Sequence, residues 1–329
     1  MRSTVYSTWR EMAVAAVCDR RAEDTKEFGG HRPPLQTISS HLPSGESYKR
    51  IAAVTRHPSN SWPPRIMKIL FIGDIFGEPG RRIVREQLPG LIAELAPDLI
   101  VANGENSAHG FGITPNQVDE LLDLGIDVLT TGNHVWDRKE IIPYLAEHSG
   151  GRLIRPANFP DGAPGRGLYL GRTRAGVAYA VLNLQGRVFM TSIDCPFRAA
   201  DALLAGLPAE VKIRILDIHA ETTSEKVAMG WYLDGRLTAL VGTHTHIPTA
   251  DERVLPEGTA YITDVGMSGP YESVIGIEKQ IVIDKFLKQM PAKFEVARGD
   301  VRLSGVLIEA DPSDGRALSI QRIMRARPK

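Results

Sequence analysis

Short apolar runs alternate with helical patterns from Met67 onward, and this alternation predicts an α/β fold. The run Ile69–Ile72 is apolar at every position, which is typical of a strand buried on both faces. The helical pattern after it is interrupted by Pro89, where we expect a kink or a break near Leu88. This half predicts a right-handed βαβαβ unit with a mostly parallel sheet, its strands at 69–72, 99–102 and 126–129 and its helices at 83–95, 114–124 and 138–147.

The second half is richer in predicted strands. Helices are expected at 196–204, 222–233 and 277–289, and strands at 168–170, 177–184, 211–218, 237–241, 259–263, 294–297, 301–308 and 317–323. The last two strands flank an Asp-Pro-Ser-Asp-Gly turn and are expected to pair antiparallel. We expect 264–269 to be a structural turn. This order favours two sheets packed face to face with helices outside over one open sheet.

Residues 1–66 differ from the rest of the chain. They contain ten Lys or Arg and six Asp or Glu, a net charge of +4, with several prolines and no sustained hydrophobic period. We expect a disordered leader, which is too acidic for a transit peptide. Because Met67 directly precedes the first strand, we favour a start-site artefact over a functional leader. Residues 67–329 are expected to form a single domain.

Composition narrows the function classes. Lys and Arg total 39 and Asp and Glu total 39, so the zero net charge argues against an extended nucleic-acid-binding face but leaves a small nucleotide substrate open. No apolar run reaches the ~18 residues of a membrane span. The two cysteines, Cys18 and Cys195, cannot form a disulfide framework, so a cytoplasmic address is expected. A homo-oligomer remains open.

Polar residues with metal-binding side chains follow five of the predicted strands. The carboxyl ends of neighbouring strands open on one crevice, so these side chains are expected to converge. Two of the histidines are only two positions apart and can face that crevice together if the chain turns at Gly242. The residues are Asp74, Glu105, Asn106, Asn133, His134, His219, His244 and His246.

Seven of these eight groups, namely two carboxylates, two carboxamides and three imidazoles, form a ligand set without a thiolate. Such a set suits Fe, Mn or Zn and disfavours a cysteine-type zinc site. These seven ligands exceed the needs of one tetrahedral ion and suit two ions, with Glu105 as the natural bridging carboxylate. Two divalent ions and two carboxylates leave a charge surplus of about +2, which suits an anionic substrate and a bridging hydroxide. Such a pair of metals activates water for an in-line displacement at phosphorus.

This ordered set of motifs resembles the calcineurin-like metallophosphoesterases, and more closely their YmdB-type bacterial branch. The resemblance covers about Met67 to Arg325 and leaves residues 1–66 unmatched. A Gly-Asp or Gly-Asn-His motif alone would be a weak signal, whereas the ordered set is highly specific. The motifs are Gly73-Asp-Ile-Phe-Gly-Glu-Pro-Gly80, Gly104-Glu-Asn106, Gly132-Asn-His-Val-Trp-Asp137, His219-Ala-Glu221 and Gly242-Thr-His-Thr-His246.

The resemblance implies a four-layer α-β-β-α sandwich with mixed sheets and a dinuclear centre of iron, or alternatively manganese, ahead of zinc. It implies hydrolysis of phosphodiesters, with cyclic nucleotides as the substrate class, by attack of a metal-bridging hydroxide. Carried over residue by residue, Asp74, Glu105, Asn106 and His246 would hold the first metal, and Glu105, Asn133, His219 and His244 the second. His134 would assist as an imidazolium that stabilises the phosphorane or protonates the leaving oxygen.

The sequence departs from the wider superfamily at three positions. Phe76 replaces a metal-binding histidine, so Asn106 is expected to fill the gap, and Glu105 replaces the usual bridging Asp. Val135 stands where an acidic residue usually follows Gly-Asn-His, which leaves open whether Asp137 orients His134. Two alternatives to a phosphodiesterase also stay open. One is a metal-containing regulatory protein that binds a nucleotide or a partner with little turnover, and the other is a phosphomonoesterase or nucleotidase.

Overall fold

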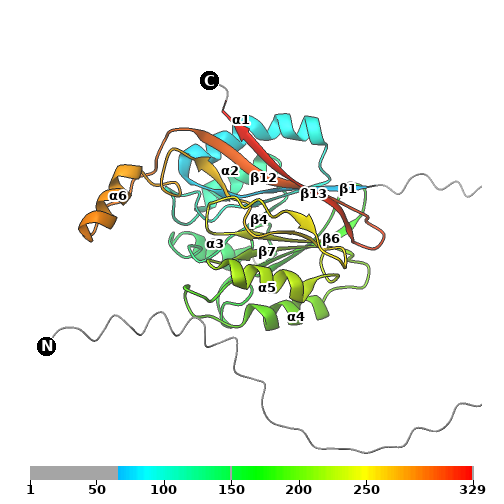
Figure 1. The fold of residues 1–329 in the computed structure, drawn as a ribbon. Helices are drawn as coiled ribbons and strands as arrows, with labels where there is room; N and C mark the ends of the chain where they lie inside the picture. Colours follow the sequence, from blue (N-terminus) through cyan, green and yellow to red (C-terminus); the bar gives the residue numbers. More distant parts are fainter. Residues whose placement is uncertain (1–65, 149, 328–329) are drawn as a thin grey trace, which may run out of the picture. The chain divides into compact units, whose positions relative to one another are not determined.

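The structure is a computed structural model that describes residues 66–148 and 150–327. The expected leader lies outside the described residues except for Ile66, so its disorder and the domain boundary stay predictions. Figure 1 labels most of the elements along the chain. The helices are α1 (Gly77–Leu95), α2 (Pro115–Asp123), α3 (Ile141–Glu147), α4 (Pro196–Ala205), α5 (Thr223–Leu233) and α6 (Lys279–Lys288).

The strands form two mixed sheets. The first sheet has the order β2-β11-β12-β1-β3-β4, with β13 also paired to β12, and the second has the order β5-β6-β7-β8-β10-β9. The strands β1, β3 and β4 run parallel, as do β6, β7, β8 and β10. Their bounds are β1 (Met67–Ile72), β2 (Asp74–Ile75), β3 (Leu99–Asn103), β4 (Val128–Thr130), β5 (Leu168–Arg172), β6 (Ala178–Gln185), β7 (Ile213–His219), β8 (Ala239–Thr243), β9 (Arg253–Val254), β10 (Ala260–Ile262), β11 (Met267–Pro270), β12 (Val301–Ala310) and β13 (Ala317–Ala326).

Strand β1 has no alternation of apolar and polar residues because both of its faces are buried. Ile69 and Phe71 point into the core between the two sheets, whereas Leu70 and Ile72 point into the core beneath α1, α2 and α3. Strand β7 divides its side chains in the same way, because Ile213 packs between the sheets and Leu216 packs under α4 and α5. Helices therefore cover the outer face of each sheet, and the expected α-β-β-α sandwich is confirmed (Figure 1).

Helix α1 differs from its prediction because Pro89 does not end it. The helix is assigned without a break from Gly77 to Leu95. Pro89 is exposed, so water at the surface can satisfy the carbonyl group that loses its N–H partner to the proline ring. Residues 294–297 were also expected to form a strand, but Val296 makes only an isolated bridge to Ile277.

The predicted turn at 264–269 is wrong in part, because it contains most of strand β11. Met267 and Ser268 pair parallel with Asp74 and Ile75 of β2, and Gly269 pairs antiparallel with β12. These pairings tie the segment after β1 to the edge of the first sheet. No helix within the described residues is long and apolar enough to cross a membrane.

Candidate metal centre

The predicted site residues come together at the carboxyl ends of strands from both sheets. Asp74, Glu105 and Asn133 follow β1, β3 and β4 of the first sheet. His219 ends β7 and His244 follows β8 of the second sheet. Contacts between the two groups, such as the His219–Glu105 pair, cross from one sheet to the other. The crevice is therefore formed by the ends of both sheets, as expected for open α/β strands.

One cluster of donor atoms surrounds the Nε2 atom of His219. This nitrogen lies 2.8 Å from Glu105 Oε1, 3.0 Å from Asn133 Oδ1 and 3.0 Å from His244 Nδ1. Among the described residues, Glu105, His219 and His244 also form the cluster of acidic and imidazole groups compact enough to hold a metal ion. Their donor atoms match the second metal set expected from the sequence.

The protonation of His219 is fixed from its other side. Thr243 Oγ1 donates a hydrogen bond to Asp217 Oδ1 at 2.7 Å, so its oxygen accepts from Nδ1–H of His219 at 2.9 Å. Nε2 is therefore the ring nitrogen that faces the cluster, and its lone pair becomes available to a metal ion when its proton is released. Asp217 and Thr243 are both completely buried, and the sequence reading assigned neither a role.

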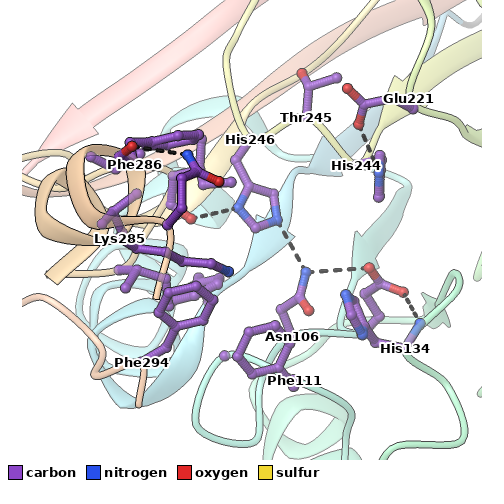
Figure 2. A pocket seen from close by; sticks show the side chains of 18 residues that line it. Asn106, Phe111, His134, Glu221, His244, Thr245, His246, Lys285, Phe286 and Phe294 are labelled. Carbon is purple, nitrogen blue, oxygen red and sulfur yellow. Dashed lines mark hydrogen bonds and ion pairs between the residues drawn. The ribbon is translucent and has the colours of Figure 1, made fainter. Parts of the chain in front are cut away.

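A second group lies on the other side of Glu105. Asn106 Nδ2 donates to Glu105 Oε1 at 3.3 Å and to His246 Nε2 at 3.1 Å (Figure 2). His246 Nδ1 donates to the carbonyl oxygen of Ile275 at 2.8 Å, so its Nε2 also carries a lone pair. Asp74 Oδ1 is 4.0 Å from that Nε2. These are the residues expected to hold the first metal.

Two buried oxygen atoms of this group are suited to contact a cation. Asp74 Oδ1 and Asn106 Oδ1 have no hydrogen-bond partner among the described residues. A buried oxygen without a partner is costly in free energy unless an ion or water satisfies it. The donor set, with its lone pairs directed inward and its unsatisfied oxygens, fits a site for metal ions.

The pKa shifts of the buried acidic and imidazole groups also indicate that the centre favours a bound positive charge. Burial, only partly opposed by the nearby His219, raises the pKa of the Asp74 carboxyl well above its ordinary value. The effect of burial on Glu105 is outweighed by the attraction of His219, His134 and His244, which lowers its pKa to about 2. Despite burial, the Glu105 contact raises the pKa of His219 to about 9. A metal cation can replace the proton held there, because ligating imidazoles are deprotonated.

The turn that presents His244 and His246 does not lie at Gly242, where it was predicted. Gly242 is inside β8, and a Cβ at this position would lie 1.8 Å from the carbonyl oxygen of Thr263. The reversal occurs at the histidines themselves, whose φ angles are 98° and 67°. Positive φ at residues other than glycine is uncommon and concentrates at functional sites.

Gly132 illustrates how closely the backbone approaches the donors. A Cβ at this position would lie 2.1 Å from Cδ2 of His219. Any larger residue would displace the His219 ring, so the glycine before Asn133 allows a close approach, as the sequence suggested.

His134 lies beside the donor cluster without joining it. Its backbone N–H donates to Glu105 Oε2 at 3.2 Å, while its ring Nδ1 donates to Asp137 Oδ2 at 2.9 Å. Asp137 therefore orients His134, which settles the question that the sequence left open. The ring of Phe111 packs edge-on against His134, with 5.1 Å between the ring centres.

Comparison with known proteins identifies the family of this chain. Residues 70–323 match the sequence profile of the family described as YmdB-like protein. The chain belongs to the YmdB-like family. Over 258 residues, 78% of this chain and 97% of the relative, it is 48% identical to the 2',3'-cyclic-nucleotide 2'-phosphodiesterase of Bacillus subtilis (strain 168).

Two solved structures extend the family comparison to the fold. A crystal structure of a hypothetical protein from Thermus thermophilus matches with a TM-score of 0.74 and 40% identity, covering 80% of this chain and 100% of that one. A crystal structure described as a novel phosphatase from Mycoplasma pneumoniae matches with a TM-score of 0.74 and 34% identity, covering 80% and 94%. The YmdB-like fold and the metallophosphoesterase resemblance read from the motifs are thereby confirmed.

Asp264 also supports this YmdB-like centre, although the sequence predicted only a structural turn for residues 264–269. Its Oδ2 forms a buried ion pair with Lys226 Nζ at 2.7 Å and accepts from the backbone N–H and hydroxyl of Thr245 at 3.1 and 2.8 Å. Thr245 is the residue between the two histidines of the turn. A charged residue at a strand end was visible in the sequence, but its pairing with a lysine of α5 depends on the fold.

A pocket of about 520 Å³ opens beside the centre. One side is polar and includes Glu105, Asn106, His134, His244 and His246. The other side is formed by residues 274–294, including part of α6 (Figure 2). Glu105, Asn106, His244 and His246 therefore line a cavity large enough for a small organic substrate.

Proposed function

We propose that this chain is a metal-dependent phosphodiesterase that hydrolyses small phosphodiesters of the cyclic-nucleotide class. The observation that carries the proposal is the inward-facing donor cluster around His219 Nε2, with His134 beside it at the pocket. The 48% identical relative named as a 2',3'-cyclic-nucleotide 2'-phosphodiesterase supports the choice of substrate class.

Two transition-metal ions would occupy the centre. Asp74, Asn106 and His246 would hold one ion, Asn133, His219 and His244 the other, and Glu105 would serve both. Iron is the first expectation from the family resemblance, with manganese as the alternative, and a set of carboxylate and imidazole ligands without thiolate suits both. When bound, such a pair lowers the pKa of water and polarises the oxygens of a phosphoryl group.

The protein's own residues would then position and protonate the substrate. The phosphate would lie on the polar side of the pocket, between the donor cluster and His134. Because the Asp137 carboxylate accepts from Nδ1–H, the Nε2 of His134 is left to give a proton to the leaving oxygen or to stabilise the developing charge. The hydrogen bond from its backbone to Glu105 fixes the distance between this ring and the donor cluster.

A substrate panel tests the proposal against a binding protein and against a monoesterase. Purified, metal-loaded protein is assayed with 2',3'-cyclic nucleotides, a linear dinucleotide and nucleoside monophosphates, with the His134→Ala variant alongside. We expect hydrolysis of the cyclic diesters to exceed that of monoesters and to depend on His134. Tight nucleotide binding without turnover would favour the regulatory protein, and faster hydrolysis of monoesters would favour a nucleotidase.

A further inference from the structure

The pocket at the metal centre continues well beyond the groups that contact phosphate. Its second side is mainly apolar and includes Ile275, Val282, Phe286 and Phe294, together with Lys285. A phosphate group alone would be bound by the polar side. The apolar side therefore fits the organic part of a substrate whose ester group lies at the centre.

Helix α6 contributes one continuous face to this side. Val282, Lys285 and Phe286 line the pocket, and their spacing of i, i+3 and i+4 places them along one stripe of the helix; Gln289, which follows the helix with a φ of 53°, also lines the pocket. Of the helix's residues only Val282 is buried, whereas the Phe286 side chain is 71% exposed. Phe286 is therefore an aromatic face at the pocket that remains open to a ligand.

The apolar side is joined directly to the metal centre through Ile275. Its carbonyl oxygen accepts the hydrogen bond that orients His246, and its side chain, 48% exposed, lines the pocket. Its φ of 48° is rare for a β-branched residue, and Gly276 follows it with a φ of 102°. Through this tight turn, the apolar side of the pocket is only one hydrogen bond away from His246, a predicted metal ligand.

Lys285 adds a donor to the aromatic surface. Its Nζ lies 4.5 Å from the centre of the Phe294 ring, on the side of the pocket opposite His134 and His244 (Figure 2). Within the described part of the chain, no carboxylate lies at ion-pair distance from this amine. The surface thus combines aromatic faces with an available hydrogen-bond donor, which matches a flat ring with acceptor atoms on its edge.

We propose that the α6 side of the pocket is a nucleobase subsite, in which Phe286 stacks on the base and Lys285 donates to its edge. The proposal rests on the proposed phosphodiesterase function and adds the residues that recognise the nucleoside. Stacking accepts any base because every base has a π-face, so the subsite binds purines and pyrimidines alike. It distinguishes nucleotides from phosphodiesters that lack a base.

The test compares substrates that share the reacting group and differ in the base. Values of kcat/KM are measured for 2',3'-cyclic AMP and for ribose 2',3'-cyclic phosphate, which has no base. Phe286→Ala is expected to lower kcat/KM for the nucleotide about 5- to 150-fold and to leave the base-free substrate unchanged. Phe286→Tyr should retain the wild-type preference, because its ring still stacks.

Leu287→Ala is the matched control. Leu287 is the next residue of α6 and is 77% exposed, but it does not line the pocket. It should leave both substrates unaffected. Equal effects of Phe286→Ala on the two substrates, or no effect on either, would overturn the base subsite while leaving the phosphodiesterase intact.

A binding measurement keeps the two proposals separable. Calorimetry with adenosine 3'-monophosphate and ribose 3-phosphate reports on base recognition without turnover. We expect the wild type to bind the nucleotide more tightly and Phe286→Ala to remove that difference. Equal affinities in the wild type would overturn the subsite, whether or not the protein hydrolyses cyclic nucleotides.

Discussion

At the scale of single residues, three histidines of the centre share one feature: the Nδ1 atom of each ring forms a hydrogen bond with a neighbouring residue. Thr243 holds Nδ1 of His219, and the carbonyl of Ile275 holds Nδ1 of His246. In both rings Nε2 is therefore the nitrogen that faces the proposed metal ligands. His134 uses the same device toward Asp137, but its ring lies outside the donor cluster. Similar chemistry at three histidines thus supports two kinds of role, ligation and proton transfer.

Replacing His134 separates these roles. His134→Ala is expected to lower the turnover of cyclic nucleotides by about 10²- to 10⁴-fold, because a group that protonates the leaving oxygen is lost. The defect should shrink for a diester with a nitrophenolate leaving group, which needs little protonation. Steady-state rates on both substrates, with metal analysis of each preparation, check this expectation.

Two variants serve as controls for that experiment. His219→Ala removes a predicted ligand and should lose metal and activity together. Asp137→Asn should keep its metal and show a smaller rate defect, because it disturbs only the orientation of His134. A His134→Ala protein that loses metal as readily as His219→Ala would show that His134 is a ligand or its support.

At the scale of elements, the segment between β8 and β10 presents the two histidines through an unusual backbone. His244 and His246 adopt positive φ, and the Thr245 between them is held by Asp264. Asp264 is in turn neutralised by Lys226 of α5, and both side chains are buried. The α5 helix therefore supports the metal centre from a distance without contributing a ligand.

Removal of Lys226 tests this support. Lys226→Met leaves the Asp264 charge buried without its partner, so the free energy of unfolding should fall by about 3–5 kcal/mol. Lys279→Met is the matched control, because the Lys279–Glu272 pair is half exposed and its loss should leave the free energy of unfolding nearly unchanged. Urea unfolding of both variants gives the comparison, and equal effects would refute the role of the buried pair.

The elements also indicate what sequence alone can specify. The ends of the apolar strands predicted that the candidate ligands would lie together, because the carboxyl ends of neighbouring strands open on one crevice. Local patterns could not anticipate α1 continuing through Pro89, since its tolerance depends on which side of the helix faces water. Strand β11 and the Lys226–Asp264 pair depend on partners distant in the chain, so neither leaves a periodic signal.

At the scale of the whole molecule, two sheets bring ligands together that lie up to 172 positions apart, from Asp74 to His246. Strand β1 begins at Met67, whose side chain is 2% exposed and which pairs with Ala310 of β12. A chain that starts at Met67 thus retains every described strand. The described fold therefore does not need residues 1–66 for any of its strands.

We expect removal of residues 1–66 to leave the fold and the activity unchanged. The melting temperature and the turnover of cyclic nucleotides should match those of the full chain, because no predicted ligand or core residue is lost. Thermal unfolding and rate measurements on both proteins test this. A clear drop in either quantity would show that the leader contributes to the folded enzyme.

The central claim is that one shared carboxylate, Glu105, organises two metal ions for phosphodiester hydrolysis. Its most direct test is a titration of metal-stripped protein with Mn²⁺ while the hydrolysis of 2',3'-cyclic AMP is followed. We predict that the wild-type rate rises until about two equivalents per chain are bound, and that Glu105→Gln binds both ions weakly and stays nearly inactive. Saturation of the wild type at one equivalent, or a fully active Glu105→Gln protein with two metals, would contradict this account.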